Sequence, residues 1–240
     1  MIRTDGRRPD QLREVRITED AQVFAEGSVL VEHGKTRVLC AVSVEDRVPK
    51  FLRGTDSGWI TAEYAMLPRS TYVRSPRENR VGGPRGRTHE IQRLIGRSLR
   101  ASVDLVALGE RTLTVDCDVI LADGGTRAAA ITGAYVALYQ SLMALVNRGV
   151  LPSIPVRCAI AATSVGVVDG VVLTDLCYEE DHRAESDFNV VMTDYGEFVE
   201  IQGTAERGSF SKSTMDEILI SAERAIEQLF DLQREVLEKF

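Results

Sequence analysis

A glycine-glycine-threonine-arginine turn at residues 124–127 carries the residue types that bind phosphate. It follows a strand-like run over 112–121 and precedes a helical run over 128–146. Glycines let the backbone approach a ligand closely, and the first N–H groups of a helix have no partners within it. These donors favour an anion, and the guanidinium of Arg127 suits phosphate oxygens. The turn predicts a phosphate site, and a tight turn with a solvated arginine is the alternative.

A second group of candidate residues is acidic and lies at 179–187. Asp181 and Asp187 are an even number of residues apart, so an extended backbone would point both carboxylates to one side. Two carboxylates without cysteine or histidine ligands are typical of Mg²⁺ or Mn²⁺ sites, in which the ion keeps several waters. A solvated acidic turn is the alternative interpretation.

Positive charge is concentrated in one segment of an otherwise acidic chain. The 240 residues have a formal net charge of −7, yet nine arginines and two glutamates lie between Arg69 and Arg100. That segment has a charge of +7, which leaves −14 for the remainder. Arg93, Arg97 and Arg100 share the back of a helix that is apolar on its other side. The block indicates one place that receives a nucleic acid, and a solvated helix face is the alternative.

The three groups together predict phosphoryl transfer on a nucleic acid. The transition state of that reaction spreads negative charge over phosphoryl oxygens, which cations and oriented N–H groups stabilise. The chain has neither a Walker motif nor the Rossmann glycine pattern. The anion at the turn therefore need not belong to a nucleoside triphosphate.

The elements that must position these residues alternate between strands and helices. Strands are expected at 12–17, 28–32, 36–42, 112–121, 156–168, 171–177, 190–192 and 198–201, with hairpin turns at 33–35, 169–170 and 194–196. Helices are expected at 88–105, at 128–146 and near the C-terminus, where Ser213 and Asp216 form a box-like cap. We predict layered α+β packing in a single domain over residues 1–240.

Composition is that of an ordinary globular protein, with 44% apolar and 27% charged residues. No apolar run approaches the ~20 residues that span a bilayer, and the first eight residues lack the apolar stretch of a signal peptide. We therefore expect a cytoplasmic protein without a membrane partner. Buried free thiols in strand-like surroundings are expected, rather than a disulfide frame or zinc site, at Cys40, Cys117, Cys158 and Cys177.

Eight segments in order along nearly the whole chain resemble the ribonuclease PH family, phosphate-dependent 3′→5′ exoribonucleases that trim tRNA precursors. They read GRRPDQLR at 6–13, AEGSVLV at 25–31, GWITAEY at 58–64, MLPRST at 66–71, GRTHEIQRLI at 86–95, DCDV at 116–119, ADGGTR at 122–127 and DFNVVMT at 187–193. The resemblance implies a β-α-β-α layered core of the ribosomal protein S5 domain 2-like type. It also implies a homo-hexamer built as a trimer of dimers.

The resemblance further implies roles for individual residues. The attacking inorganic phosphate, a co-substrate, would be held by Arg87, Gly125, Thr126 and Arg127. Asp181 and Asp187 fall on the acidic pair that binds Mg²⁺ or Mn²⁺ and assists catalysis, and Asp187 is our first choice for proton transfer.

RNA contacts are expected from arginines of the positive segment. Three of them match arginines of the family's loop linked to RNA contact and ring assembly, and the full expected set is Arg69, Arg74, Arg77, Arg80, Arg93 and Arg97. The stretch VGGPR at 81–85 replaces a more basic stretch of relatives. This departure affects the expected RNA affinity of the loop and leaves the chemistry intact.

The implied reaction is phosphorolysis, in which phosphate attacks the last phosphodiester at the RNA 3′ end and a nucleoside 5′-diphosphate leaves. The reverse reaction would add nucleotides from diphosphates. Two alternatives belong to other classes: an inactive ring subunit that only threads RNA, and a phosphotransferase acting on a small molecule. The intact candidate residues argue against the first alternative, and the arginine block argues against the second.

Overall fold

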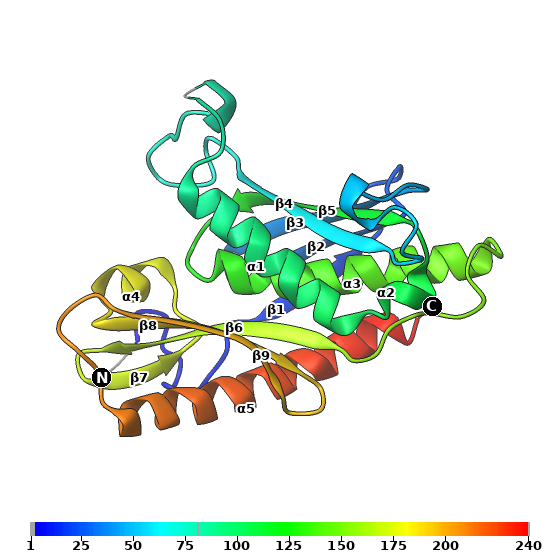
Figure 1. Ribbon diagram of the computed structural model, residues 1–240. Helices are drawn as coiled ribbons and strands as arrows, with labels where there is room; N and C mark the ends of the chain where they lie inside the picture. The colour runs from blue at the N-terminus through cyan, green and yellow to red at the C-terminus, as the bar shows by residue number, and fades with distance from the viewer. Residues whose placement is uncertain (1–2, 81, 240) are drawn as a thin grey trace.

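Two β-sheets alternate with two layers of helices in the structure, a computed structural model that describes residues 3–80 and 82–239 (Figure 1). The first sheet is followed by α1 (Gly86–Ser102) and α3 (Thr126–Asn147), then by the second sheet, and finally by α5 (Lys212–Leu237). The predicted β-α-β-α core is therefore confirmed. Met1 and Ile2 of the N-terminal segment and Val81 of the VGGPR stretch lie outside the described residues.

The first sheet has five strands in the order β1-β2-β3-β5-β4. They are β1 (Val15–Glu19), β2 (Gly27–His33), β3 (Thr36–Glu45), β4 (Trp59–Met66) and β5 (Thr112–Leu121). Neighbouring strands are antiparallel except β4 and β5, which are parallel. The β2–β3 hairpin is where the sequence predicts it, with His33 opposite Thr36. Strand β4 was not predicted, although Ile60, Ala62 and Tyr64 alternate as its buried face.

The second sheet has four antiparallel strands in the order β7-β6-β8-β9. They are β6 (Ile160–Val168), β7 (Val171–Thr174), β8 (Ser186–Thr193) and β9 (Phe198–Ala205). The predicted turns at 169–170 and 194–196 both connect antiparallel strands. The chain leaves the sheet after Thr174, earlier than predicted, because Asp175 takes a left-handed φ of 53°.

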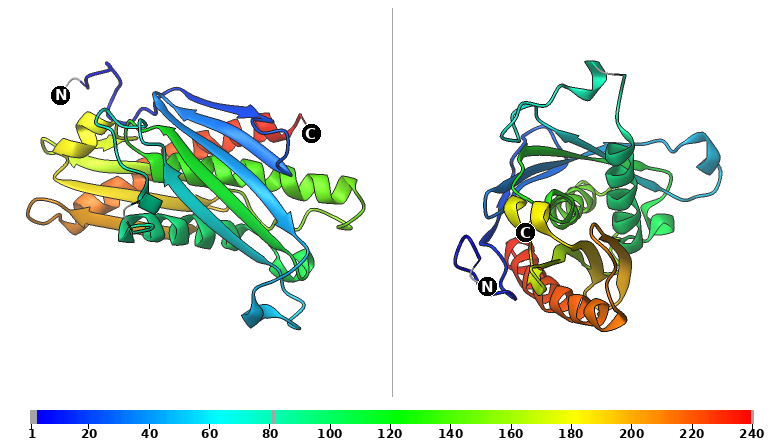
Figure 2. Two further views of the ribbon diagram at one scale, coloured as in Figure 1. Left: turned by 90° about the horizontal axis from the view of Figure 1, so that it is seen from above. Right: turned by 90° about the vertical axis from the view of Figure 1, so that its left-hand side faces the viewer.

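Helix α3 is enclosed between the two sheets, as the end view shows (Figure 2). Its predicted core face is buried, but its other sides are largely buried as well, because β2 and β3 pack on one side and β6 on the other. By length and composition alone α3 is long and apolar enough to cross a membrane, and 78% of its most apolar window is buried within the molecule.

Several predicted boundaries are wrong for local reasons. The first long helix ends at Ser102, Val103 pairs with Val156, and Asp104 caps the short α2 (Leu105–Leu108). Helix α5 is capped by Ser211, whose Oγ accepts a hydrogen bond from the Thr214 N–H at 3.1 Å, and not by Ser213.

The four cysteines are buried free thiols, as predicted. The sequence predicts Cys158 and Cys177 within strands, but in the structure Cys158 precedes β6 and Cys177 follows β7.

A loop rich in arginine, here called the arginine loop (residues 67–80 and 82–85), projects from the body beyond the start of α1 (Figure 1). It contains the short 3₁₀ helix η2 (Glu78–Arg80), and a second one, η1 (Lys50–Leu52), lies between β3 and β4. The arginine loop leads from the end of β4 to the N-terminus of α1, so it connects two elements that border the candidate site.

Candidate active site

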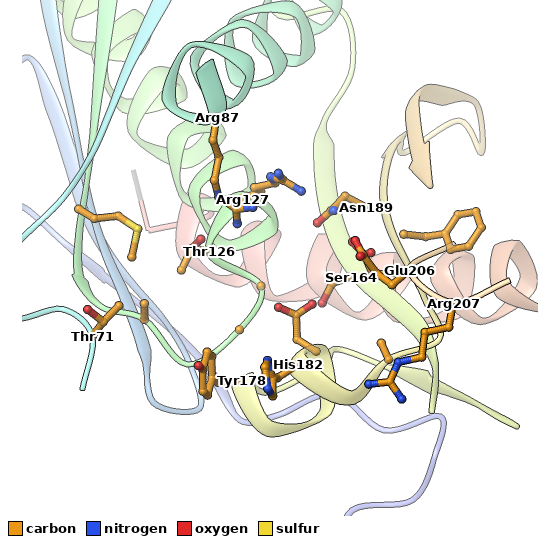
Figure 3. Close-up of a pocket in the computed structure, with 18 residues that line it drawn as sticks. Thr71, Arg87, Thr126, Arg127, Ser164, Tyr178, His182, Asn189, Glu206 and Arg207 are labelled. Carbon is orange, nitrogen blue, oxygen red and sulfur yellow. The ribbon is translucent and has the colours of Figure 1, made fainter. Parts of the chain in front are cut away.

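A pocket of about 530 Å³ lies where the β5–α3 turn, the start of β8 and the loop after β9 meet (Figure 3). Its wall contains all six residues that the sequence assigns to phosphate, metal and catalysis: Arg87, Gly125, Thr126, Arg127, Asp181 and Asp187. These residues are as much as 100 positions apart in the chain. The fold thus places the predicted anion site and the predicted cation site in one cavity.

The turn before α3 needs glycine at both of its central positions. Gly124 and Gly125 have φ values of 77° and 65°, in the left-handed region. A Cβ on Gly124 would lie 2.3 Å from the carbonyl oxygen of Leu176, so the backbone could not stay in place. Among residues 3–80 and 82–239, no side chain caps the start of α3 after Gly125. The first N–H groups of a long helix therefore face the pocket, as the sequence predicts.

An ion pair between Arg13 and Asp175 lies beneath this turn. The guanidinium donates to both carboxylate oxygens, Nε to Oδ2 at 2.9 Å and Nη2 to Oδ1 at 2.6 Å. Arg13 Nη1 also donates to the carbonyl oxygen of Asp123 at 2.5 Å, and Thr36 Oγ1 donates to that of Gly124 at 2.7 Å. The carbonyl oxygens of Asp123 and Gly124 thus accept hydrogen bonds from side chains of the first sheet and of the segment before it. These bonds fix the N-terminus of α3 relative to the first sheet.

The surroundings of this pair keep it ionised. Burial disfavours a charged Asp175, but the charge and hydrogen bonds of Arg13 outweigh burial and hold the pKa of Asp175 well below its usual range. His33, fully buried nearby, has its pKa lowered to about 4 by burial, so the imidazole is neutral near pH 7. A second guanidinium, that of Arg7, lies 3.7 Å from the Asp175 carboxylate, so two arginines share this buried negative charge.

Arginines near the N-terminus hold the segment that carries Asp181. Arg3 makes a bidentate pair with Glu180, with both N–O distances at 2.7 Å, and donates to the Thr174 and Asp175 carbonyl oxygens. Glu180 belongs to α4 (Tyr178–Arg183) and directly precedes Asp181. Sequence reasoning assigned no role to Arg3, because Glu180 and the residues 174 and 175 lie more than 170 positions away from it.

Asp181 and Asp187 line the same pocket, but their backbone conformation differs from the predicted one. The expectation of an extended backbone is wrong, since Asp181 lies in α4 and only Asp187 lies in a strand, β8. Burial raises the pKa of each carboxyl, and Glu206 raises both further. The charge of Asp181 also raises the pKa of Asp187. The pocket thus brings three carboxylates together, and burial is the main reason for the raised pKa values of the two aspartates.

Cations occupy the opposite side of the pocket. Arg87, in the first turn of α1, and Arg127, in that of α3, extend into the same space (Figure 3). Both lower the pKa of Asp181 and of Asp187, although burial outweighs them. Within residues 3–80 and 82–239, the buried Nε of Arg127 has no hydrogen-bond partner. Arg127 Nη2 lies 3.7 Å from Glu90 Oε1, and its Nε remains a donor available for an anion.

A tyrosine of β4 orients the threonine of the turn. The buried hydroxyl of Tyr64 donates to Thr126 Oγ1 at 2.9 Å. Because Thr126 Oγ1 accepts this bond, its own proton is free to point into the pocket. Tyr64 is part of the segment GWITAEY, but no pattern in the sequence links it to residue 126.

The six arginines predicted to contact RNA lie outside this pocket wall, as far as the described residues form it. Arg69, Arg74, Arg77 and Arg80 are exposed on the arginine loop. Arg77 lines a second hollow of about 450 Å³, which shares Met66 and Arg87 with the first.

Of the three arginines on the back of α1, one is exposed to solvent and two contact residues of the sheets. Arg93 is exposed, whereas Arg97 makes a bidentate pair with Glu200 of β9 at 2.9 and 2.6 Å. Arg100 lies over the ring of Trp59, with its guanidinium carbon 4.3 Å from the ring centroid. The predicted positive stripe is therefore partly used to join α1 to the two sheets.

Sequence reasoning missed several residues of the pocket wall. They come mainly from the second sheet and its connections, and include Ser164, Tyr178, His182, Asn189, Glu206 and Arg207. Glu206 and Arg207 follow β9 in a loop without a recognisable motif, so only their position in space identifies them.

Two family models match the chain, "3′ exoribonuclease family, domain 1" over residues 11–144 and "domain 2" over residues 158–225. Proteins named ribonuclease PH from Dehalococcoides mccartyi are 56% identical in sequence to this chain. For strain CBDB1 the match spans 238 residues, 99% of each chain, and for strain 195 it spans 236 residues, 98% of this chain and 99% of the relative.

Solved structures share the fold at lower identity. A structure described as "archaeoglobus fulgidus exosome with RNA bound to the active site" has a TM-score of 0.82 and 23% identity, covering 95% of this chain and 91% of that one. The crystal structure of rice (Oryza sativa) Rrp46 has a TM-score of 0.79 and 23% identity, and the match covers 98% of this chain and 100% of the rice chain. The predicted fold class, of the S5 domain 2-like type, is confirmed.

Replacing Asp175 with asparagine should lower the free energy of unfolding by about 3–5 kcal/mol, because the charge of Arg13 would be left buried without its partner. Urea denaturation followed by circular dichroism measures this. Asp10→Asn is the matched control, since it breaks the exposed pair with Arg8 and should change stability little. Equal effects of the two substitutions would contradict a supporting role for the Arg13–Asp175 pair.

Replacing Tyr64 with phenylalanine should weaken sulfate or phosphate binding about 5-fold, the value of roughly one hydrogen bond of ~1 kcal/mol, because Thr126 would no longer be oriented. Isothermal titration calorimetry measures the affinity. Tyr195→Phe is the control. The Tyr195 hydroxyl donates to the backbone carbonyl oxygen of Arg157, and Tyr195 is not among the residues that line the pocket. Unchanged affinity in the Tyr64 variant would show that Thr126 needs no such partner.

Proposed function

The chain belongs to the 3′ exoribonuclease family, and from this premise we propose that it is a phosphorolytic 3′→5′ exoribonuclease that shortens tRNA precursors and other RNAs. One observation carries the proposal: the uncapped α3 N-terminus and two arginines face two carboxylates across one pocket. That arrangement suits an attacking phosphate on one side and a scissile phosphate on the other.

The chemistry exchanges one P–O bond for another. An oxygen of hydrogen phosphate attacks the phosphorus of the last phosphodiester, the bond to the 3′ oxygen of the preceding nucleotide breaks, and a nucleoside 5′-diphosphate leaves. Arg87, Arg127, the Thr126 hydroxyl and the N–H groups of the turn hold the attacking phosphate. These donors are in place before the reaction and stabilise the charge that develops on the phosphoryl oxygens.

The leaving 3′ oxygen must gain a proton. We assign its delivery to Asp187, whose pKa is raised by burial and by the neighbouring Asp181 and Glu206, so that its carboxyl holds a proton more readily than an ordinary aspartate. The hydrogen phosphate supplies the replacement proton, and the reaction is balanced. The same balance permits the reverse direction, in which a nucleoside diphosphate extends the RNA and phosphate is released.

A divalent cation, Mg²⁺ or Mn²⁺, fits the two aspartates. Both carboxyls line one pocket, where the charge of Asp181 raises the pKa of Asp187, and Mg²⁺ is commonly held by one or two carboxylates together with substrate phosphates. In the described part of the chain no cluster of three or more histidines, cysteines or acids forms a closed metal site. A bound ion would be held by Asp181 and by the deprotonated form of Asp187, and it would offset charge on the scissile phosphate.

The arginine loop and the second hollow give the RNA a route to the pocket. Arg77, Arg85 and Arg87 line this hollow, which adjoins the pocket at Met66. Their charges can neutralise backbone phosphates upstream of the 3′ end. Exposed Arg69, Arg74 and Arg80 extend the positive surface outward, while Arg97 is the weakest candidate of the set because Glu200 already pairs with it.

The activity is tested with 3′-labelled RNA incubated with and without inorganic phosphate. Nucleoside diphosphates should appear only with phosphate, and Arg127→Ala should lower the rate about 10²–10³-fold, because a preorganised donor to the transition state is lost. Arg148→Ala, at the other end of α3, is the matched control and should stay near the original rate.

Three outcomes of this assay would point elsewhere. Nucleoside monophosphates without phosphate would identify a hydrolase. RNA binding without turnover would identify an inactive ring subunit. The absence of salt-dependent RNA binding would favour a small-molecule phosphotransferase.

Mn²⁺ binding should weaken in Asp187→Asn and should also weaken in the unsubstituted protein as the pH falls. Protons compete with the ion for carboxylates, and a raised pKa moves that competition to higher pH than the ~3.9 of an ordinary aspartate. Calorimetric titration at several pH values measures both effects. Asp231→Asn, in an exposed pair with Arg234, is the control. An unchanged Mn²⁺ affinity in Asp187→Asn would exclude this residue as a ligand.

The proposed assembly is a homo-hexamer built as a trimer of dimers. Several large apolar side chains support association because they are strongly exposed in the single chain: Phe24 at 100%, Tyr72 at 96% and Val23 at 91%. Light scattering after size-exclusion chromatography should give six times the 26.5 kDa chain mass. A species of 26.5 kDa at working concentration would contradict the hexamer.

A further inference from the structure

Two rings on the pocket wall have no role in holding phosphate or a metal ion. Tyr178 and His182 lie one turn apart on α4, with ring centroids 6.1 Å apart and planes inclined by 13°. Both line the pocket, and Tyr178 is 59% exposed (Figure 3). A stacked pair of this kind presents a flat surface to whatever enters beside the glycine turn.

We propose that Tyr178 and His182 form a stacking platform for the base of the RNA's 3′-terminal nucleotide. The inference rests on the proposed function and adds to it a base-binding subsite. Aromatic stacking binds every base, because each base has a π-face. An exoribonuclease that removes successive nucleotides needs contacts that tolerate all four bases, and a stacking platform provides them.

The platform is adjacent to the groups that would hold the reacting phosphates. A Cβ on Gly124 would lie 2.9 Å from the backbone nitrogen of Tyr178, so the turn and the start of α4 are in direct contact. The Tyr178 N–H also points to Asp123 Oδ1 at 3.4 Å. Asp181 lies between the two rings in the sequence of α4 and lines the same pocket. A nucleotide with its phosphate near Asp181 therefore has its base within reach of the rings.

The rings are carried by a backbone that is already fixed. Glu180, between Tyr178 and His182, is 3% exposed, pairs with Arg3 through both oxygens and accepts a hydrogen bond from the Cys177 N–H at 3.0 Å. Little conformational freedom of α4 remains to be lost when a base stacks. The platform can thus contribute to substrate binding without rearrangement of the site.

The test compares RNA oligonucleotides that end in a normal or in an abasic 3′ nucleotide, with saturating phosphate and nucleoside or abasic sugar diphosphate as the measured product. Tyr178→Ala should lower kcat/KM on normal RNA about 10-fold, mainly through a higher KM, because the stacking of one base contributes an effect of about that size. On the abasic substrate, which has no base to stack, kcat/KM should change less than about 2-fold. Tyr178→Phe keeps the ring and should stay within 2-fold of the unsubstituted protein on both substrates. Tyr195→Ala, 73% exposed and away from the pocket, is the matched control.

The abasic substrate separates stacking from general damage. If Tyr178→Ala lowers kcat/KM equally on both substrates, or if Tyr178→Phe loses as much as Tyr178→Ala, the platform is refuted. If the unsubstituted protein releases no diphosphate from normal RNA, the proposed function itself fails, which is a different result from a failed platform. A 10-fold loss confined to normal RNA supports the platform.

Discussion

The buried ion pair between Arg13 and Asp175 is the interaction on which the candidate site depends. It supports the glycine turn through the carbonyl oxygen of Asp123, and it lies against the backbone of Gly125, where a Cβ would be 3.0 Å from Arg13 Nη2. Without Asp175 the Arg13 guanidinium would be buried without its carboxylate partner, which is strongly unfavourable. The pair joins the segment before β1 to the residue that follows β7, and through the Asp123 carbonyl oxygen it also holds the β5–α3 turn of the pocket.

The layered architecture explains why one pocket receives residues from the whole chain. Helix α3 lies between the sheets, and its N-terminus points to the end of the molecule where α4 and β8 begin. Arg87 and the glycine turn come from the part matched by the first family model, and Asp181 and Asp187 from the part matched by the second. Neither part alone contains both the anion site and the carboxylates.

Two arginines and three carboxylates come together in the pocket, and a third arginine, Arg207, follows Glu206. Arg87 and Arg127 begin two helices on one side, while Asp181, Asp187 and Glu206 come from α4, β8 and the loop after β9. The opposite charges influence each other's ionisation, yet Arg127 keeps a buried donor without a hydrogen-bond partner in the described part of the chain. Such a site has binding capacity on both sides, for an anion and for a cation, which is what two reacting phosphates and a metal ion would require.

The sequence by itself determined the alternation of strands and helices, the buried thiols and the glycine turn before α3, because each depends on residues that are neighbours in the chain. The family resemblance added Arg87 and the roles of Asp181 and Asp187. Only the tertiary structure decided that Arg13 pairs with Asp175, that Tyr64 orients Thr126 and that Arg97 is engaged by Glu200. These partners are 162, 62 and 103 positions apart, and no periodicity connects residues at such separations. Tertiary structure also overrode local preference, since α4 replaced the extended segment expected around Asp181.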